Sequence, residues 1–252
     1  GQETLGRLRT MSSGDHPGMG FLEHLEELRW RLVRSFSAII LGSAISYGYI
    51  DEILSILLYP STITNNPIVI QSLQVQSMFL IKWFISFASG FIMALPYLIY
   101  QFWKFVAPGL KINEKRFALP FVFFAFTSFI CGVVFGYFVL VPFSLEFFSG
   151  IAAPHVENNF SIQYYFSFIT WLLIGAGVIF QLPVVSLVLS TIGILTPAFM
   201  RHYRRHSIVV ILILSSFITP PDPVSMLIMS FPLVLLYETS IGVSWLVNRK
   251  RT

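Results

Sequence analysis

The chain has 252 residues, of which 55% are hydrophobic and only 11% charged, and its formal net charge is +4. With a mean hydropathy of +0.75, this composition excludes an ordinary water-soluble fold, because too few polar side chains are present to cover its surface. The length accommodates about six membrane-spanning helices of about 20 residues each and leaves no room for a second soluble domain. The sequence therefore predicts an all-α, polytopic membrane protein.

Residues 1–20 are polar and rich in glycine and serine. They lack the apolar core of a signal peptide, so we expect them to form a flexible tail outside the membrane. The remaining residues, 21–252, are predicted to form a single membrane domain.

Six apolar runs follow the tail, and we expect each to be a helix because a backbone in hydrocarbon must satisfy its own hydrogen bonds. The runs lie at about residues 32–50, 77–100, 117–142, 163–192, 207–218 and 224–247. The fifth run reaches only about 18 Å as a helix, against a hydrocarbon core of about 30 Å. Helix six is also predicted to be short, on the premise that Glu238 lies at the membrane interface.

The basic residues predict the topology. Six spans put both termini on one side, and fifteen of the sixteen basic residues fall on that side. They are Arg7, Arg9, Arg29, Arg31 and Arg34 before the first helix, Lys104, Lys111, Lys115 and Arg116 after the second, Arg201, Arg204 and Arg205 after the fourth, and Arg249, Lys250 and Arg251 after the last. By the positive-inside rule, both termini are cytoplasmic. Lys82 lies near the opposite face, where we expect its amine to snorkel outward.

The segment HLEELRWRLVR, residues 24–34, carries dense charge directly before the first span. On a helix, Glu27 lies one turn from both Glu23 and Arg31, which is typical of an amphipathic interfacial helix. One interpretation is that these charges only pair with each other and with lipid headgroups. The other is that a carboxylate here binds a cationic partner.

A second carboxylate belongs to the same cytoplasmic face. Glu114 is the only acid in the loop after helix two, where it stands among four basic residues. It could form a simple salt bridge within the loop. If instead it lies near Glu27, the two carboxylates would form a site for a pair of guanidinium groups, which carboxylates bind in a bidentate manner.

Several motifs in this chain resemble those of the TatC family, the receptor subunit of the twin-arginine protein translocase. They are HLEELRWRL at 24–32, YQFWKFVAPGL at 100–110 followed by NEKR, FGYFVLVPFSLEFF at 135–148, FQLP at 180–183, and TPPDP at 219–223 leading to FPLVLLYE. The resemblance implies a cup-shaped, non-enzymatic protein without cofactor or metal, in the bacterial inner membrane or, as the alternative, in an organelle membrane. It also implies binding of twin-arginine signal peptides and export of folded proteins with TatA and TatB partners, using the proton-motive force. We further expect a homo-oligomer within a receptor complex and no nucleic-acid partner.

The resemblance also implies roles for individual residues. Glu27, Arg29, Phe105 and Glu114 match positions tied to signal-peptide recognition, and the two glutamates would bind the two arginines. Pro60 and Asp222 match outer-face positions used for structure or activity.

Gln181 matches an intramembrane polar position in helix four where many relatives carry glutamate. It cannot titrate, although it could still hydrogen-bond to TatA-type or TatB-type helices. Glu238, in helix six, is a second candidate for partner binding or proton linkage. The alternative is an interfacial hydrogen-bonding role for Glu238.

Two other classes of protein compete with this interpretation. Polar groups in or near the membrane, Lys82, Gln181 and Glu238, would also suit an ion-coupled secondary transporter of a small solute. A membrane-embedded enzyme is disfavoured because the sequence has neither a GxSxG nucleophile nor an HExxH metal pair. Finally, Gly132 and Gly136 form a GxxxG spacing, which we expect to serve close packing inside the bundle rather than dimerisation.

Overall fold

The computed structural model describes residues 21–64, 68–106, 118–150, 159–218 and 223–249. The predicted tail at 1–20, and the predicted site residues Glu114 and Asp222, lie outside these ranges. The described chain is almost entirely helical, as predicted.

The helices follow the predicted apolar runs in order. The first half of the chain contains α2 (Phe21–Gly48), α3 (Ile50–Thr62), β1 (Val69–Gln71), α4 (Ser77–Val106), α5 (Ala118–Phe135), the π-helical turn η3 (Gly136–Leu140) and α6 (Val141–Gly150). The second half contains β2 (Asn159–Ser161), α7 (Ile162–Ile179), α8 (Leu182–Ile192), α9 (Pro197–His202), α10 (Arg204–Ile218) and α11 (Pro223–Arg249). The two short strands, which the sequence did not predict, pair in parallel with Val69 opposite Asn159.

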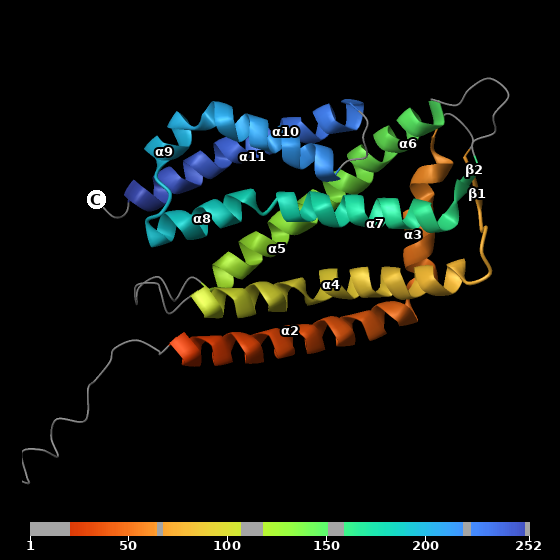
Figure 1. The fold of residues 1–252 in the computed structure, drawn as a ribbon, viewed down its shortest axis with the longest axis horizontal. Coiled ribbons are helices and arrows are strands. Elements are labelled where there is room, and N and C mark those ends of the chain that lie inside the picture. Colours follow the sequence, from red (N-terminus) through yellow and green to blue (C-terminus); the bar gives the residue numbers. More distant parts are fainter. Residues whose placement is uncertain (1–20, 65–67, 107–117, 151–158, 219–222, 250–252) are drawn as a thin grey trace, which may run out of the picture.

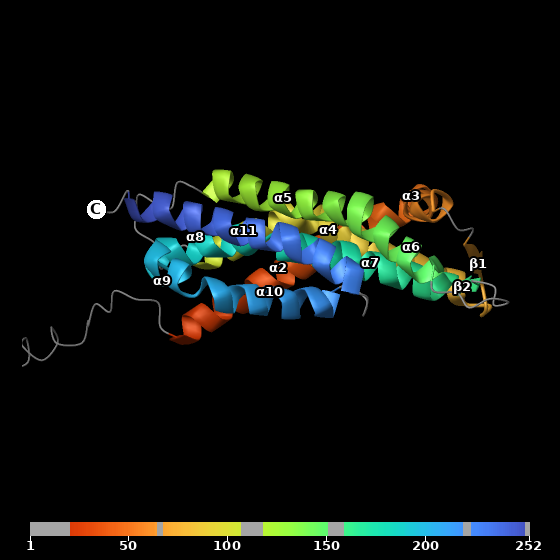
Figure 2. The ribbon, with the colours of Figure 1, turned by 90° about the horizontal axis from the view of Figure 1, so that it is seen from above.

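The long helices run roughly along one direction and define two ends of the molecule (Figures 1 and 2). We call the end where α2 begins and α11 finishes the proximal end, at the left of Figure 1. The distal end is formed by α3, α6 and the β1–β2 pair. The first and last described residues therefore lie at the same end of the bundle.

Within the described residues, four helical segments are long and apolar enough to cross a membrane, by length and composition. They are Ser77–Phe105, Leu119–Gly150, Ile162–Thr191 and Met226–Leu246. A fifth crossing results if α2 and α3 are counted as one span bent by 79°. The count of six spans therefore stays a prediction.

Helix five is short, as predicted, whereas helix six is not. The 15 residues of α10 extend about 22 Å, less than the hydrocarbon core of about 30 Å. The expectation of a short helix six is wrong, because α11 has 27 residues and continues past Glu238 to Arg249. Glutamate is a good helix former, and the Glu238 carboxylate pairs with Arg204 of α10.

The bundle packs around α7. Its residues Phe166, Ile169, Leu172 and Ala176 are almost completely buried among side chains of α3, α4, η3 and α11. A second, smaller cluster joins α4, α5 and α8 nearer the proximal end. It consists of Trp103, Phe121, Ala125, Val184 and Val188.

Small residues set the distance between α5 and α7, because helices in lipid associate through close van der Waals packing rather than through hydrophobic burial. A Cβ atom added at Gly132 would lie 2.7 Å from the Ala176 carbonyl oxygen and 2.8 Å from Gly177 Cα. At Gly136 it would lie 3.1 Å from the Leu173 side chain. The predicted role of the GxxxG spacing in packing within the bundle is confirmed.

We predict that Gly132→Ala destabilises the protein by about 1–3 kcal/mol, because the new methyl group would overlap the backbone of α7. The measurement is thermal unfolding of the detergent-solubilised protein. Gly242→Ala is the matched control, since a Cβ atom there meets nothing within 4 Å and alanine is the better helix former. A Gly132→Ala protein as stable as the parent would contradict close packing at this position.

Candidate functional site

An apolar pocket opens between α2, α4, α5 and α8 in the proximal half of the molecule. Its volume is about 540 Å³. Most of its lining is aliphatic or aromatic, including Leu28, Leu32, Leu95, Phe105 and Val184. Polar side chains are few, so each one that lines the pocket is a candidate for recognition. They are Arg31, Ser35, Gln101 and Gln181.

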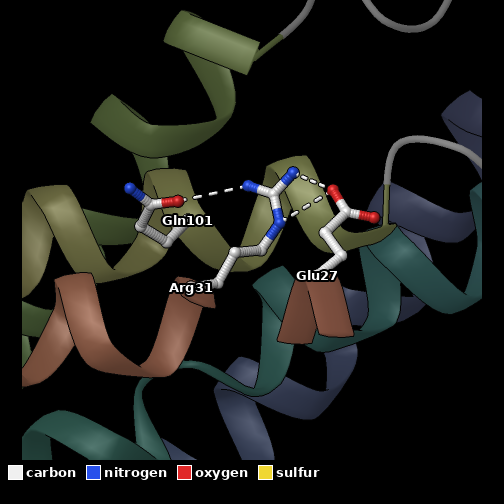
Figure 3. A network of polar contacts seen from close by, with 3 residues as sticks. All are labelled: Glu27, Arg31 and Gln101. Atoms are coloured by element: carbon white, nitrogen blue, oxygen red, sulfur yellow. Dashed lines mark hydrogen bonds and ion pairs between the residues drawn. The ribbon is translucent and has the colours of Figure 1, made fainter. Parts of the chain in front are cut away.

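A network of three side chains joins α2 to α4 at this pocket (Figure 3). Arg31 donates from Nε to Oε1 of Glu27 over 3.0 Å, and its Nη2 also donates to that oxygen. Its Nη1 donates to Oε1 of Gln101 over 3.1 Å. The Arg31 side chain is 15% exposed and that of Glu27 is 23% exposed. Glu27 thus presents a well-shielded carboxylate that already binds one guanidinium.

This network shows how the charges of the segment HLEELRWRLVR are paired, which was one of its two interpretations; it does not test the other, binding of a cationic partner. Glu27 and Arg31 do pair one turn apart on α2, as simple charge pairing requires. An isolated surface pair would contribute little. Gln101 on α4 is buried, however, and it adds a bond across 70 residues of sequence. The pair therefore fixes α2 against α4 beside the pocket.

Two other predicted site residues on these helices differ in their placement. Phe105 is partly buried and lines the same pocket as Arg31. Arg29 is exposed, and on an α-helix it lies about 200° around from Glu27. The structure places Phe105 in the pocket lining with Arg31 and leaves Arg29 on another face of α2.

Sequence reasoning missed Gln101. It lies within YQFW near the end of α4 and is buried. The signal in the sequence was a single amide side chain within an apolar run. Arg31 was predicted only as a charge partner, yet it lines the pocket.

Gln181 lies at a break in the helix formed by α7 and α8. Its Nε2 donates to the Ala125 carbonyl over 3.1 Å, and the Ser128 hydroxyl donates to the Phe180 carbonyl. Pro183, at the start of α8, has no N–H and interrupts the helical ladder at this point. Two hydrogen bonds from side chains therefore attach α5 to the break, and the bond from Gln181 requires a donor rather than a charge.

Glu238 belongs to a different region. Arg204 Nη2 donates to its Oε2 over 2.7 Å, and both side chains are about half exposed. One residue earlier, the Tyr237 hydroxyl donates to the Met200 carbonyl over 2.8 Å and attaches α11 to α9. These contacts favour the interfacial role, with Glu238 paired to α10 and outside the lining of the pocket.

Lys82 lies near the distal end. Its Nζ donates to Oδ1 of Asp51 over 2.8 Å, which links α4 to the start of α3. The Asp51 side chain is 78% exposed. Lys82 thus extends toward an exposed carboxylate, a geometry that suits an outward-reaching amine better than a site for ion conduction.

Pro60 is fully buried inside α3. A proline has no N–H, so it cannot donate to the carbonyl four residues earlier, which belongs to Ile56. The Tyr137 hydroxyl donates to the Ile56 carbonyl over 2.7 Å, and the Tyr165 hydroxyl donates to the Leu57 carbonyl over 3.0 Å. Side chains of η3 and α7 thereby complete the hydrogen bonding of α3 and fix it at the distal end.

Comparison with known proteins gives one family. The family described as "Sec-independent protein translocase protein (TatC)" matches residues 23–232. Among its members, the TatC protein of Halalkalibacterium halodurans is 35% identical over 92% of this chain and 91% of its own length. That of Carboxydothermus hydrogenoformans is 37% identical over 92% of this chain and 95% of its own.

Solved structures show the same similarity. A crystal structure described as that of the twin-arginine translocase receptor TatC superposes with a TM-score of 0.77 at 34% identity. It covers 90% of this chain and all of the other. A second one, in the detergent DDM, also gives a TM-score of 0.77.

The contact at Pro60 leads to a prediction about Tyr137. We expect Tyr137→Phe to destabilise the protein by about 1 kcal/mol, because the Ile56 carbonyl then loses its donor. In a Pro60→Ala background the new N–H can donate to that carbonyl, so the same substitution should cost close to nothing. A double-mutant cycle on unfolding midpoints in detergent measures this coupling.

Tyr165→Phe is the control for this cycle. Its acceptor, the Leu57 carbonyl, faces the N–H of Ser61 rather than Pro60 in the helical ladder. Its effect should therefore be the same with and without Pro60. Equal coupling of Pro60 to both tyrosines would contradict the assignment of Tyr137 as the donor that replaces the missing N–H.

Proposed function

This chain belongs to the TatC family of Sec-independent protein translocase proteins, and we propose that it binds twin-arginine signal peptides at its proximal end. As a family member it is a component of the protein translocase and not an enzyme. The observation that carries the proposal is the Glu27 carboxylate, which is shielded and bound to a guanidinium beside an apolar pocket.

Glu27 and Glu114 are proposed to bind the two arginines of the signal peptide. The closeness of α2 and α4 supports this pairing. Phe105, which lines the pocket with Arg31, is nine residues before Glu114. Glu114 also lies only four residues before α5, whose first residue is Ala118, so it is within about 14 Å of that helix start. The chain can therefore bring both carboxylates to one rim.

The apolar pocket suits the other part of such a peptide. Phe105 is proposed to contact the peptide beside the arginine pair, and Arg29 to contact it from the exposed face of α2. Each contact between an arginine and a carboxylate contributes about 1–3 kcal/mol when it is shielded from water. A lysine ammonium cannot match the planar fork of a guanidinium, so two such contacts favour arginine over lysine.

The remaining proposals concern topology and partners. We place the protein in the bacterial inner membrane with the proximal end and both termini in the cytoplasm. Described basic residues at that end, Arg29, Arg31, Arg34 and Lys104, support this orientation. In this setting the protein acts with TatA-type and TatB-type single-span partners, as a homo-oligomer in the receptor complex, to export folded proteins with the proton-motive force.

The other candidate residues serve this assembly. Gln181 is proposed to contact partner helices, whereas Glu238, paired with Arg204, is proposed to act at the membrane interface. Pro60, together with Asp222 in the TPPDP turn, is proposed to maintain the outer face. The contacts of Tyr137 and Tyr165 with α3 support that role for Pro60.

We predict that a fluorescent twin-arginine peptide binds the detergent-solubilised protein and that its twin-lysine version binds at least tenfold more weakly. Glu27→Gln and Glu114→Gln should each weaken binding of the twin-arginine peptide about tenfold to a hundredfold. Fluorescence anisotropy gives the dissociation constants.

Glu52→Gln is the matched control, because Glu52 is an exposed carboxylate in the first turn of α3 at the distal end. It should leave peptide binding unchanged. Equal binding of the arginine and lysine peptides, or binding that survives both substitutions at the proximal end, would refute the proposed carboxylate pair.

A further inference from the structure

We propose that Arg31 is an internal competitor for the signal-peptide site, and that an incoming arginine must take Glu27 from it. This inference rests on the proposed binding of a signal guanidinium at Glu27. It assigns to Arg31 a role in setting the affinity threshold of the receptor.

The first argument is the chemistry of the contact. Arg31 presents to Glu27 the same guanidinium group that a twin-arginine peptide would present. Its Nε and Nη2 both donate to Oε1 (Figure 3). Two guanidinium groups cannot both donate two bonds to that one oxygen, because a carboxylate oxygen offers about two lone-pair sites. The other oxygen of Glu27, Oε2, is buried, so a peptide arginine can reach this carboxylate only after Arg31 has moved.

The second argument is the position of Arg31. Its side chain is 15% exposed and lines the apolar pocket. A charged side chain in such surroundings needs a polar partner wherever it goes. Gln101 is buried on α4 and accepts from Nη1 over 3.1 Å, on the side of the guanidinium away from Glu27. Gln101 can keep its hydrogen bond to Arg31 when a peptide arginine binds Glu27, so Arg31 still has a polar partner after it is displaced.

The third argument concerns selectivity. Displacement of Arg31 costs the same free energy whichever ligand takes its place, so it weakens binding of every cationic peptide by a common factor. The ratio between arginine and lysine peptides does not change. This common penalty lowers the affinity of every ligand, so weak ligands no longer occupy the site while strong ones still do. Arg31 therefore sets an affinity threshold and does not change the preference for arginine over lysine.

The test compares Arg31→Met with Arg34→Met in the full-length, detergent-solubilised protein. Methionine keeps a straight apolar side chain in the pocket and removes the guanidinium. Arg34 is exposed on the same helix, so its substitution reports the general effect of removing one positive charge from this face. The probes are the fluorescent twin-arginine and twin-lysine peptides.

R31M should bind both peptides about tenfold more tightly than the parent, with the arginine-to-lysine ratio unchanged, whereas R34M should change either affinity by less than about twofold. If R31M does not fold, R31K replaces it. Its ammonium cannot bridge Glu27 and Gln101 as the planar fork does, so a gain of about threefold is expected.

Unchanged or weaker binding by R31M, with the parent protein binding normally, would overturn this inference and leave the proposed function standing. Weaker binding would show instead that Arg31 positions Glu27 for the peptide, and unchanged binding would show that Arg31 does not affect the affinity. A gain of equal size in R34M would also overturn it, because the effect would then be general electrostatics. Absence of twin-arginine binding in the parent protein would refute the proposed function and, with it, this inference.

Discussion

Hydrocarbon offers no hydrogen bonds, so each interruption of a helix within this bundle must be satisfied by the protein itself. The fold contains several interruptions of this kind. Pro60 interrupts α3, where Tyr137 and Tyr165 donate to neighbouring carbonyls. The α7–α8 break is bridged to α5 through Ser128 and Gln181. At these interruptions, polar side chains are therefore part of the backbone hydrogen bonding of the bundle.

The pocket depends on the same constraint. Its walls come from α2, α4, α5 and α8, and α8 has its position relative to α5 because the bonds of Gln181 and Ser128 span the break. At its rim, the Glu27–Arg31–Gln101 network joins α2 to α4. The pocket is thus held by polar contacts in its wall and at its rim, although most of its surface is apolar.

The sequence predicted the helical class, the order of the helices and the short fifth helix, since these follow from hydropathy and helix length. It could not predict the pairing of Glu238 with Arg204, because these residues lie 34 positions apart. Gln101 was missed for the same reason: an amide in an apolar run has no local feature that identifies its partner on another helix. The packing role of Gly132 was predictable, because a GxxxG spacing already implies close contact, whereas α7 as the partner of α5 was not.

The hydrogen bond from Tyr137 to the Ile56 carbonyl, which Pro60 leaves without its helical donor, also restricts how this sequence can evolve. If Pro60 is replaced first, the helix regains its own N–H donor, and the hydroxyl of Tyr137 is no longer required by the Ile56 carbonyl. If Tyr137 is replaced first, that carbonyl has lost its donor while the proline is still present. The two substitutions are therefore not equivalent as first steps. A lineage that loses both residues is expected to pass through the form without the proline, and the tyrosine can drift only after that.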